Sequence, residues 1–267
     1  MTSSAACSDA DDAAQAVFRP VEAGVLRIAT ALPAPGFWDG DDPASVDGGF
    51  EWELATLLAE RFGLALEVVE VPFAQLDAGD LAGADLAIAQ ITATTERAAR
   101  VDFSIGYFDT AIGVLARTGI DIADLREARE LQWAVVDGST QQDFLDDVVD
   151  PTRPALVVAD ETTAAKAVAD GRADAGLADL ATALVIAGAR SDIEVVAQFV
   201  TRQRYAVAIP ADGPDHTANR DAVSTAIRAL EASGTLDELV ERWLEPRFER
   251  NPDRVPVIIA RMPRSTP

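Results

Sequence analysis

The chain has 267 residues, enough to bury one large hydrophobic core or two medium-sized ones, and its 45 acidic and 22 basic side chains give a formal net charge of −23. A field of this sign repels nucleic acid and anionic membrane surfaces, so we exclude both as partners. No stretch of the sequence reaches the roughly 18 uninterrupted apolar residues of a membrane span.

Strands and helices are predicted to alternate from Val25 onward. Apolar spacing and turn signals first predict strands over 26–30, 65–71, 86–89 and 111–116, with helices over 50–62 and 121–130. A second cycle predicts strands over 133–136, 155–158, 175–177 and 205–209, with helices over 141–149, 162–169, 220–232 and 236–244. Such alternation favours an α/β fold around largely parallel sheets, and two cycles of similar size indicate two lobes.

Both ends of the chain fall outside this alternation. Residues 1–24 are predicted to be a flexible leader. Within the leader, Cys7 follows small residues as at a bacterial lipoprotein junction, but no hydrophobic signal region precedes it and the usual leucine three residues earlier is absent. A lipidated cysteine and a stray one both stay open. Residues 248–267 form a C-terminal extension, in which 255–260 is either an edge strand or a loose segment.

The segment 90–104 carries the clearest functional signal. It follows a short apolar run that is typical of a buried strand, and Thr94 is the expected N-cap of a short helix. Arg97 would then lie in the first helical turn, where a cation is poorly placed against the helix dipole. This placement indicates a carboxylate site made of the guanidinium, threonine hydroxyls and free helix N–H groups. The alternative is a surface arginine paired with Glu96.

Six segments in order resemble the family 3 extracellular solute-binding proteins, the polar amino acid receptors of ABC importers. They lie at 26–37, 49–54, 90–104, 138–141, 171–179 and 234–244. The resemblance implies the two-lobed fold of type II periplasmic binding proteins, in which each lobe is a mainly parallel sheet flanked by helices. Residues 25–115 with 206–247 would form lobe 1 and residues 116–205 lobe 2, joined by a two-strand hinge near 113–117 and 202–207.

The resemblance also implies how a ligand is held. Arg97 and the Thr92 hydroxyl would bind the α-carboxylate of a free amino acid, and Asp179 would accept its α-ammonium. Asp179 follows a predicted strand, where ligands of open α/β sheets collect, although it could instead cap the helix expected over 180–187. Ser139 and Thr140 open a helix whose N–H groups would face the same anion, and ordinary N-capping explains them as well.

The side-chain pocket departs from the pattern of receptors for cationic amino acids. Those commonly carry an acid and an aromatic residue after the first strand, where this chain has Ala31 and Ala34. A cationic ligand would then leave a buried charge unpaired. Phe73 is expected to form an apolar wall, and Gln90 to reach the ligand. We therefore expect a neutral amino acid with a less polar side chain, or a carboxylate with an apolar body.

Other chemistry is limited by the residue types present. His216 is the only histidine and Cys7 the only cysteine, so we expect no metal centre, no catalytic triad and no cofactor. The predicted function is that of a monomeric extracytoplasmic receptor, periplasmic or lipid-anchored through Cys7, that delivers an amino acid to the membrane permease of an ABC importer. The alternative is a dehydratase resembling cyclohexadienyl dehydratases, which would need a buried general acid, and we expect no cleft carboxylate beyond Asp179. The sensing domain of a longer receptor is a third interpretation.

Overall fold

The computed structural model describes residues 17–260. One eight-stranded sheet runs through the whole molecule, in the strand order β2-β1-β3-β8-β4-β7-β5-β6. The strands are β1 (Val25–Thr30), β2 (Ala65–Glu70), β3 (Leu86–Ala87), β4 (Val101–Arg117), β5 (Trp133–Val136), β6 (Leu156–Val158), β7 (Ala175–Asp179) and β8 (Ile193–Pro210). Neighbours at the two ends of the sheet are parallel, whereas β8 and β4 run antiparallel to each other and to the strands beside them.

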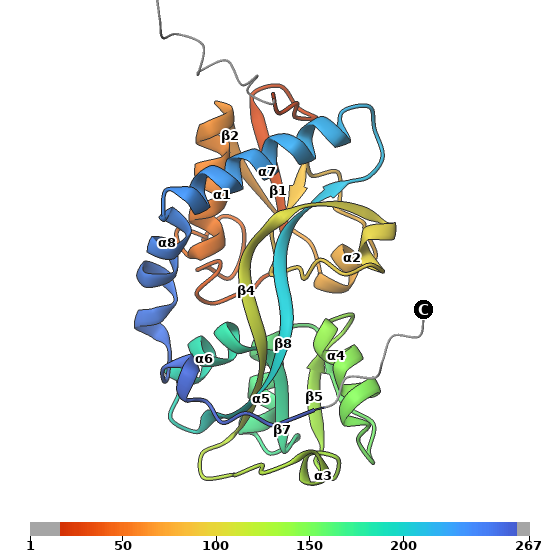
Figure 1. Ribbon diagram of the computed structural model, residues 1–267, viewed down its shortest axis with the longest axis vertical. Coiled ribbons are helices and arrows are strands. Elements are labelled where there is room, and N and C mark those ends of the chain that lie inside the picture. The colour runs from red at the N-terminus through yellow and green to blue at the C-terminus, as the bar shows by residue number, and fades with distance from the viewer. Residues whose placement is uncertain (1–16, 261–267) are drawn as a thin grey trace, which may run out of the picture.

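Helices cover both ends of this sheet. They are α1 (Phe50–Phe62), α2 (Phe73–Asp77), α3 (Leu125–Ala128), α4 (Thr140–Phe144), α5 (Glu161–Ala169), α6 (Leu180–Gly188), α7 (His216–Ala232) and α8 (Thr235–Trp243). Figure 1 shows two lobes: lobe 1 is built on β1 to β3 with α1, α2, α7 and α8, and lobe 2 on β5 to β7 with α3 to α6. The mixed α/β class and the two-lobed architecture are those predicted.

The α1 helix illustrates how the sequence produces these elements. Phe50, Leu54 and Leu58 recur every four residues, and all three side chains are fully buried in the core of lobe 1. The helix ends at Gly63, which has a φ of 68° and donates its N–H to the carbonyls of the last turn. Side chains with a β-carbon are strained at this φ, so the glycine stops the helix.

The two long strands β4 and β8 form the connection between the lobes (Figure 1). Both are much longer than the strands predicted over 111–116 and 205–209. Polar residues directly precede each predicted strand, Asp109 and Thr110 in β4 and residues 201–204 in β8, and the observed strands continue across them. Residues 112–116 of β4 already pair with β7 of lobe 2. The structure therefore places this crossing before residue 112 rather than near 113–117.

The described part of the N-terminal segment is packed against lobe 1. Phe18 is 7 % exposed, and its ring stacks on Phe62 with the centroids 4.7 Å apart. The backbone N–H of Arg19 donates to Asn219 Oδ1 at 2.8 Å. Residues 17–24 thus differ from the flexible leader that was expected, whereas Cys7 and its lipidation lie outside the described residues.

The C-terminal extension leaves α8 in lobe 1 and crosses to lobe 2. There it is hydrogen-bonded to Gln198 of β8. The Gln198 N–H donates to the Pro256 carbonyl at 2.7 Å, and the Gln198 carbonyl accepts the N–H of Ile258 at 2.9 Å. Val255 and Ile258 are buried in the cores of lobe 2. The extension is thus a packed segment with one isolated β-bridge, between the two alternatives that the sequence left open.

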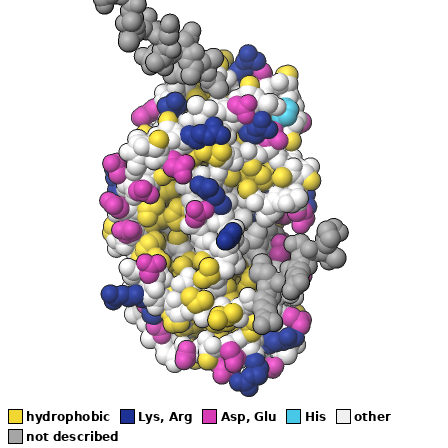
Figure 2. Space-filling view, viewed as in Figure 1, with side chains coloured by type: hydrophobic (Ala, Val, Ile, Leu, Met, Phe, Trp, Pro, Cys, Tyr) yellow, Lys and Arg dark blue, Asp and Glu magenta, His cyan; other side chains and the backbone are white. Residues whose placement is uncertain are grey.

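Charged side chains are spread over the surface rather than gathered into one patch on the face shown in Figure 2, with apolar side chains between them near its middle. Across residues 17–260, no helix combines the length and the apolar character needed to span a bilayer.

Candidate functional site

An enclosed cavity of about 180 Å³ lies between the two lobes. This volume is below the roughly 300–1,000 Å³ of pockets for drug-sized ligands, so the cavity suits a smaller molecule. The side chains that line it include Ala31, Ala34, Glu70, Phe73 and Gln90 from lobe 1 with Arg97, and Ser139, Thr140, Gln141, Asp160, Glu161 and Asp179 from lobe 2. Of the seven ligand-binding residues predicted from the sequence, only Thr92 does not line this cavity.

Arg97 enters the cavity from the loop after β3. The Thr94 hydroxyl accepts the Arg97 N–H at 3.1 Å, as the expected cap would, but the helix that follows is a single 3-10 turn over Arg97–Ala99. The Arg97 side chain is only 5 % exposed. Glu96, its expected partner in the surface interpretation, pairs instead with Arg100. The alternative of a surface arginine is therefore wrong.

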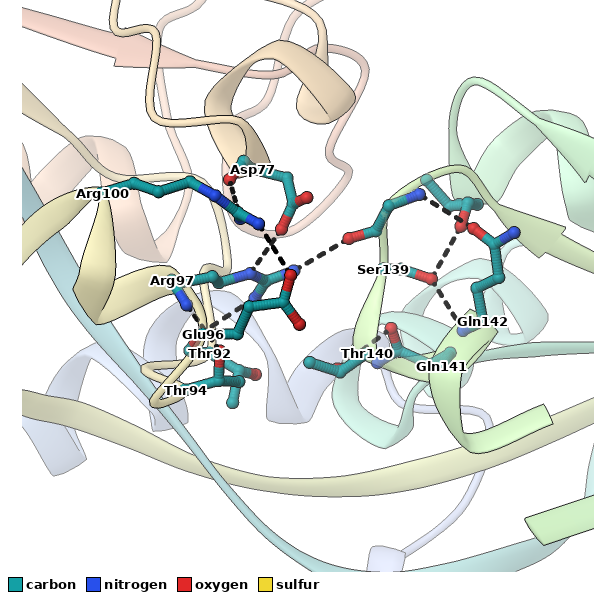
Figure 3. Close-up of polar contacts among 12 residues, drawn as sticks. Asp77, Thr92, Thr94, Glu96, Arg97, Arg100, Ser139, Thr140, Gln141 and Gln142 are labelled. Carbon is teal, nitrogen blue, oxygen red and sulfur yellow. Dashed lines mark hydrogen bonds and ion pairs between the residues drawn. The ribbon is translucent and has the colours of Figure 1, made fainter. Parts of the chain in front are cut away.

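Three fixed partners orient the Arg97 guanidinium (Figure 3). Nε donates to Asp77 Oδ1 at 2.7 Å, Nη1 to the Thr92 carbonyl at 3.0 Å, and Nη2 to the Gly138 carbonyl at 3.0 Å. A guanidinium has five N–H groups, so the partners within the described residues leave two of them for an anion. Phe73 packs beneath, with its ring centroid 5.4 Å from Arg97 Cζ, a cation–π distance.

Direct contacts join the lobes across the cavity, so the structure is a closed one. Arg97 belongs to lobe 1, and the Gly138 carbonyl that it binds belongs to lobe 2. In addition, Gln203 of the hinge strand β8 donates its side-chain N–H to Thr140 Oγ1 at 2.9 Å. Gly138 has a φ of 69°, and a β-carbon there would lie 3.4 Å from Asp77 Oδ2. The distance is an ordinary van der Waals contact, so it is the turn, with its positive φ, that favours a glycine here.

Ser139 and Thr140 divide the two roles that the sequence left open. The Ser139 hydroxyl accepts the N–H of Gln142 at 3.1 Å and donates to the Val136 carbonyl at 2.7 Å, so it caps α4. Thr140 lines the cavity, and its hydroxyl accepts the side-chain N–H of Gln203. The α4 helix is only five residues long and continues as a π-helical turn over Leu145–Val149. A contact of either residue with a ligand stays a prediction.

Asp179 ends β7 and occupies the N-cap position of α6, but its side chain makes no capping hydrogen bond within residues 17–260, and the residue lines the cavity. Its side chain is 7 % exposed, and Oδ1 has no hydrogen-bond partner within residues 17–260. Burial, with repulsion from the Glu161 carboxylate, raises the pKa of Asp179 to about 7. Tyr205, Gln141 and Arg97 lie close enough to oppose this rise, but neither Tyr205 Oη nor Gln141 Nε2 reaches hydrogen-bonding geometry.

Gln90 and Thr92 stand on either side of the turn after β3. Gln90 has a left-handed φ of 49°, and its backbone N–H donates to Glu51 Oε1 at 2.8 Å. Its side-chain amide N–H donates to the other oxygen of the same carboxylate. Thr92 is 6 % exposed, and its hydroxyl lacks a partner in the described chain while its carbonyl holds Arg97.

The match to known proteins agrees with this geometry. Residues 26–246 match the family model of bacterial extracellular solute-binding proteins, family 3. The chain belongs to this family. The L-cystine-binding protein TcyJ of Escherichia coli strain K12 is 28 % identical over 228 residues, which cover 83 % of each chain.

Solved structures of other solute-binding proteins superimpose on this family 3 chain. A solute receptor for L-cysteine of Neisseria gonorrhoeae has a TM-score of 0.74 at 26 % identity, over 86 % of this chain and 94 % of that one. An ancestral arginine-binding protein bound to arginine has a TM-score of 0.73 at 26 % identity, over 82 % and 98 % of the two chains. The relatives named here are binding proteins rather than enzymes.

Three acids that shape this site, Asp77, Glu51 and Glu161, were not among the site residues predicted from the sequence. Asp77 holds Arg97, and Glu51 is fully buried beneath Gln90, where burial raises its pKa. Trp38 and Tyr107 also donate to the Glu51 carboxylate.

Glu161 lines the cavity as the first residue of α5, directly after the N-cap of that helix. In the sequence it is an ordinary acid at a helix start, which gives no signal of a cavity. The expectation of no cleft carboxylate beyond Asp179 is wrong.

Proposed function

We propose that the protein binds a free α-amino acid in the interlobe cavity and delivers it to the membrane permease of an ABC importer. One observation carries the proposal: Arg97 and Asp179 line the same cavity from opposite lobes, and within residues 17–260 two N–H groups of Arg97 and Oδ1 of Asp179 have no partner. An α-carboxylate matches the first and an α-ammonium the second. A single zwitterion would therefore bridge the lobes.

Such a bridge can drive closure because its contacts form together only in the closed state. Changing a population from about 1 % to about 99 % closed needs a differential affinity of about 5.5 kcal/mol. Two charge-assisted hydrogen bonds at about 1.5–3 kcal/mol each supply most of this free energy. The hydrogen bond from Arg97 to the Gly138 carbonyl also stabilises the closed state, independently of the ligand.

Membership of an extracellular family supports the extracytoplasmic location and the permease partner. Cystine and cysteine receptors among the relatives support an amino acid ligand. The neutral side chain, the monomeric state and the lipid anchor stay predictions.

The first test is a thermal-shift screen of ligand-stripped protein against the twenty amino acids, cystine, prephenate and arogenate. A ligand at 100 times its dissociation constant adds about 2.7 kcal/mol to the free energy of unfolding, which gives a readable shift. We expect at least one amino acid to bind. Silence from every amino acid would contradict the proposal.

Calorimetry with matched variants then tests the residues. Arg97→Ala should weaken binding more than 100-fold, whereas Arg100→Ala, three residues later on the surface, should leave the dissociation constant within about threefold. Asp179→Asn should weaken binding about tenfold or more, with the exposed Asp170→Asn as its control. Wild-type affinity in Arg97→Ala would rule out this site.

A second candidate is a dehydratase on the same fold, which would expel water and carbon dioxide from a prephenate-like acid. One observation favours it: the raised pKa values of Asp179 and Glu161, each about 7, let either carboxyl group carry a proton at neutral pH as a general acid requires. Formation of phenylpyruvate from prephenate would support this activity, and its loss in Asp179→Asn and Glu161→Gln would assign the acid.

A further inference from the structure

The charge of the cavity does not balance that of a simple zwitterion. Arg97 is the only arginine or lysine among the described residues that line the cavity, and the acids that line it are Glu70, Asp160, Glu161 and Asp179. Glu70 is exposed to water and Asp160 caps α5, so Glu161 and Asp179 are the two acids that remain for a ligand. In addition, Asp77 already pairs with Arg97. An amino acid with no charge on its side chain would use Arg97 and Asp179 and leave the Glu161 carboxylate without a partner. Buried charges are costly unless they are paired.

Glu161 is the acid that the fold itself leaves unused. Its neighbour Asp160 caps α5, accepting the Thr163 N–H at 2.7 Å and the Thr163 hydroxyl at 2.8 Å. The Glu161 carboxylate, by contrast, has no side-chain partner in the described part of the chain and faces the cavity. A glutamate in the first turn of a helix interacts favourably with the helix dipole even when its side chain is exposed to water. The dipole alone therefore does not account for a glutamate turned into the cavity.

Gln90 adds a neutral acceptor to the same cavity. Its backbone N–H and its side-chain amide N–H both donate to the Glu51 carboxylate. This pairing orients the amide, because both Glu51 oxygens accept hydrogen bonds here, from Gln90 and from Trp38 and Tyr107. The side-chain carbonyl of Gln90 is therefore the end left for the cavity, which Gln90 lines. It can accept a hydrogen bond from a ligand.

We propose that the ligand carries a second cationic group in addition to its α-ammonium, and that Glu161 binds this group with the help of the Gln90 carbonyl. This inference rests on the proposed function and narrows it to amino acids with an ammonium or guanidinium on the side chain. It reverses the preference for a neutral ligand, which depended on the absence of an acid at Ala31. The acid comes from lobe 2 instead.

Two pairs of ligands isolate the second charge. Lysine and norleucine share a chain length but differ in the terminal ammonium, and arginine and citrulline differ in the guanidinium charge. A charge-assisted hydrogen bond corresponds to about 10- to 100-fold in affinity. We expect the wild-type protein to prefer the charged member of at least one pair by tenfold or more, measured by calorimetry at pH 7.

Glu161→Gln should reduce this preference to about threefold or less, while affinity for the neutral member changes little. Glu60→Gln removes one negative charge from an exposed site on α1 and should keep the wild-type preference. An equal affinity for both members in the wild-type protein, or an unchanged preference in Glu161→Gln, would overturn the inference. Arg97-dependent binding of neutral amino acids alone would overturn this inference and leave the proposed function standing. Failure of every amino acid to bind would remove both.

Proton release gives a readout that a purely structural role would not change. Burial raises the pKa of Glu161 to about 7, so its carboxyl group is about half protonated at pH 7. Binding of a cation should complete its ionisation and release about half a proton, seen as a dependence of the binding enthalpy on the ionisation enthalpy of the buffer. Glu161→Gln should abolish this share of the release. Equal release by both proteins would contradict a contact with Glu161.

Discussion

The ligand-free protein should lose stability as the pH rises from 5 to 8. Burial in the cavity raises the pKa values of Asp179 and Glu161 to about 7, whereas the same groups ionise near pH 4 in an unfolded chain. Between these values the folded state holds protons that the unfolded state has released. The stabilisation is therefore complete below about pH 4 and is lost as the pH rises through 7.

The size of this effect follows from the two shifts. At 1.36 kcal/mol per pKa unit, Asp179 corresponds to about 4 kcal/mol and Glu161 to about 3 kcal/mol. The two carboxylates repel each other and titrate as a pair, and part of each shift is lost below pH 5, where the unfolded chain also binds protons. Glu161 is also partly accessible to water. We therefore expect the free energy of unfolding to fall by about 3 kcal/mol between pH 5 and pH 8.

Urea unfolding at pH 5, 6, 7 and 8, followed by tryptophan fluorescence, measures this fall. Asp179→Asn should lose about half of the pH dependence and be more stable than the wild-type protein at pH 8. The control Asp170→Asn changes an exposed carboxylate that pairs with Lys166, and it should keep the wild-type slope. A free energy of unfolding that does not change with pH in the wild-type protein would show that neither carboxyl group has a raised pKa in the folded state. Equal slopes in the wild-type protein and Asp179→Asn would show that Asp179 does not contribute to the pH dependence.

Three further substitutions test the packing and the closed state. Phe18→Ala removes a buried ring that stacks on α1 and should lower the free energy of unfolding by about 3 kcal/mol; no change in a urea titration would mean that residues 17–24 do not pack. Gly188→Ala would place a β-carbon 2.0 Å from the Arg247 carbonyl and should lower the free energy of unfolding by about 1–3 kcal/mol in the same titration; no change would mean that Arg247 does not pack against α6. Thr140→Val removes the acceptor of the Gln203 hydrogen bond and should weaken ligand binding about five- to tenfold in calorimetry, and unchanged affinity would exclude a role of that bond in closure.

The sequence predicted those elements best whose residues alternate between core and solvent. The α1 helix agrees residue for residue over Phe50–Phe62, because its apolar period and its terminal glycine both act locally. The long hinge strands were predicted too short, because short polar runs, Asp109 and Thr110 in β4 and residues 201–204 in β8, interrupt their apolar sequence where the strands pass between the lobes. The α3 helix has four residues instead of ten, because its charged sequence has few apolar side chains to bury.

The site residues also differ in whether the local sequence reveals them. Arg97 and Asp179 were predicted because a family motif marks them, and both line the cavity. Asp77 was missed because its pairing with Arg97 joins two segments of lobe 1 that are 20 residues apart, and Glu161 because its role depends on how the two lobes meet. Glu161 directly follows the cap of α5, so in the sequence it is indistinguishable from an acid that stabilises a helix start.

A crystal structure of the protein with its tightest-binding amino acid tests the central claim most directly. We expect the ligand to lie in the interlobe cavity, with its α-carboxylate about 3 Å from the Nη atoms of Arg97 and its α-ammonium at about the same distance from the Asp179 carboxylate. A ligand bound outside this cavity, or one whose carboxylate contacts neither Arg97 nor the start of α4, would contradict it.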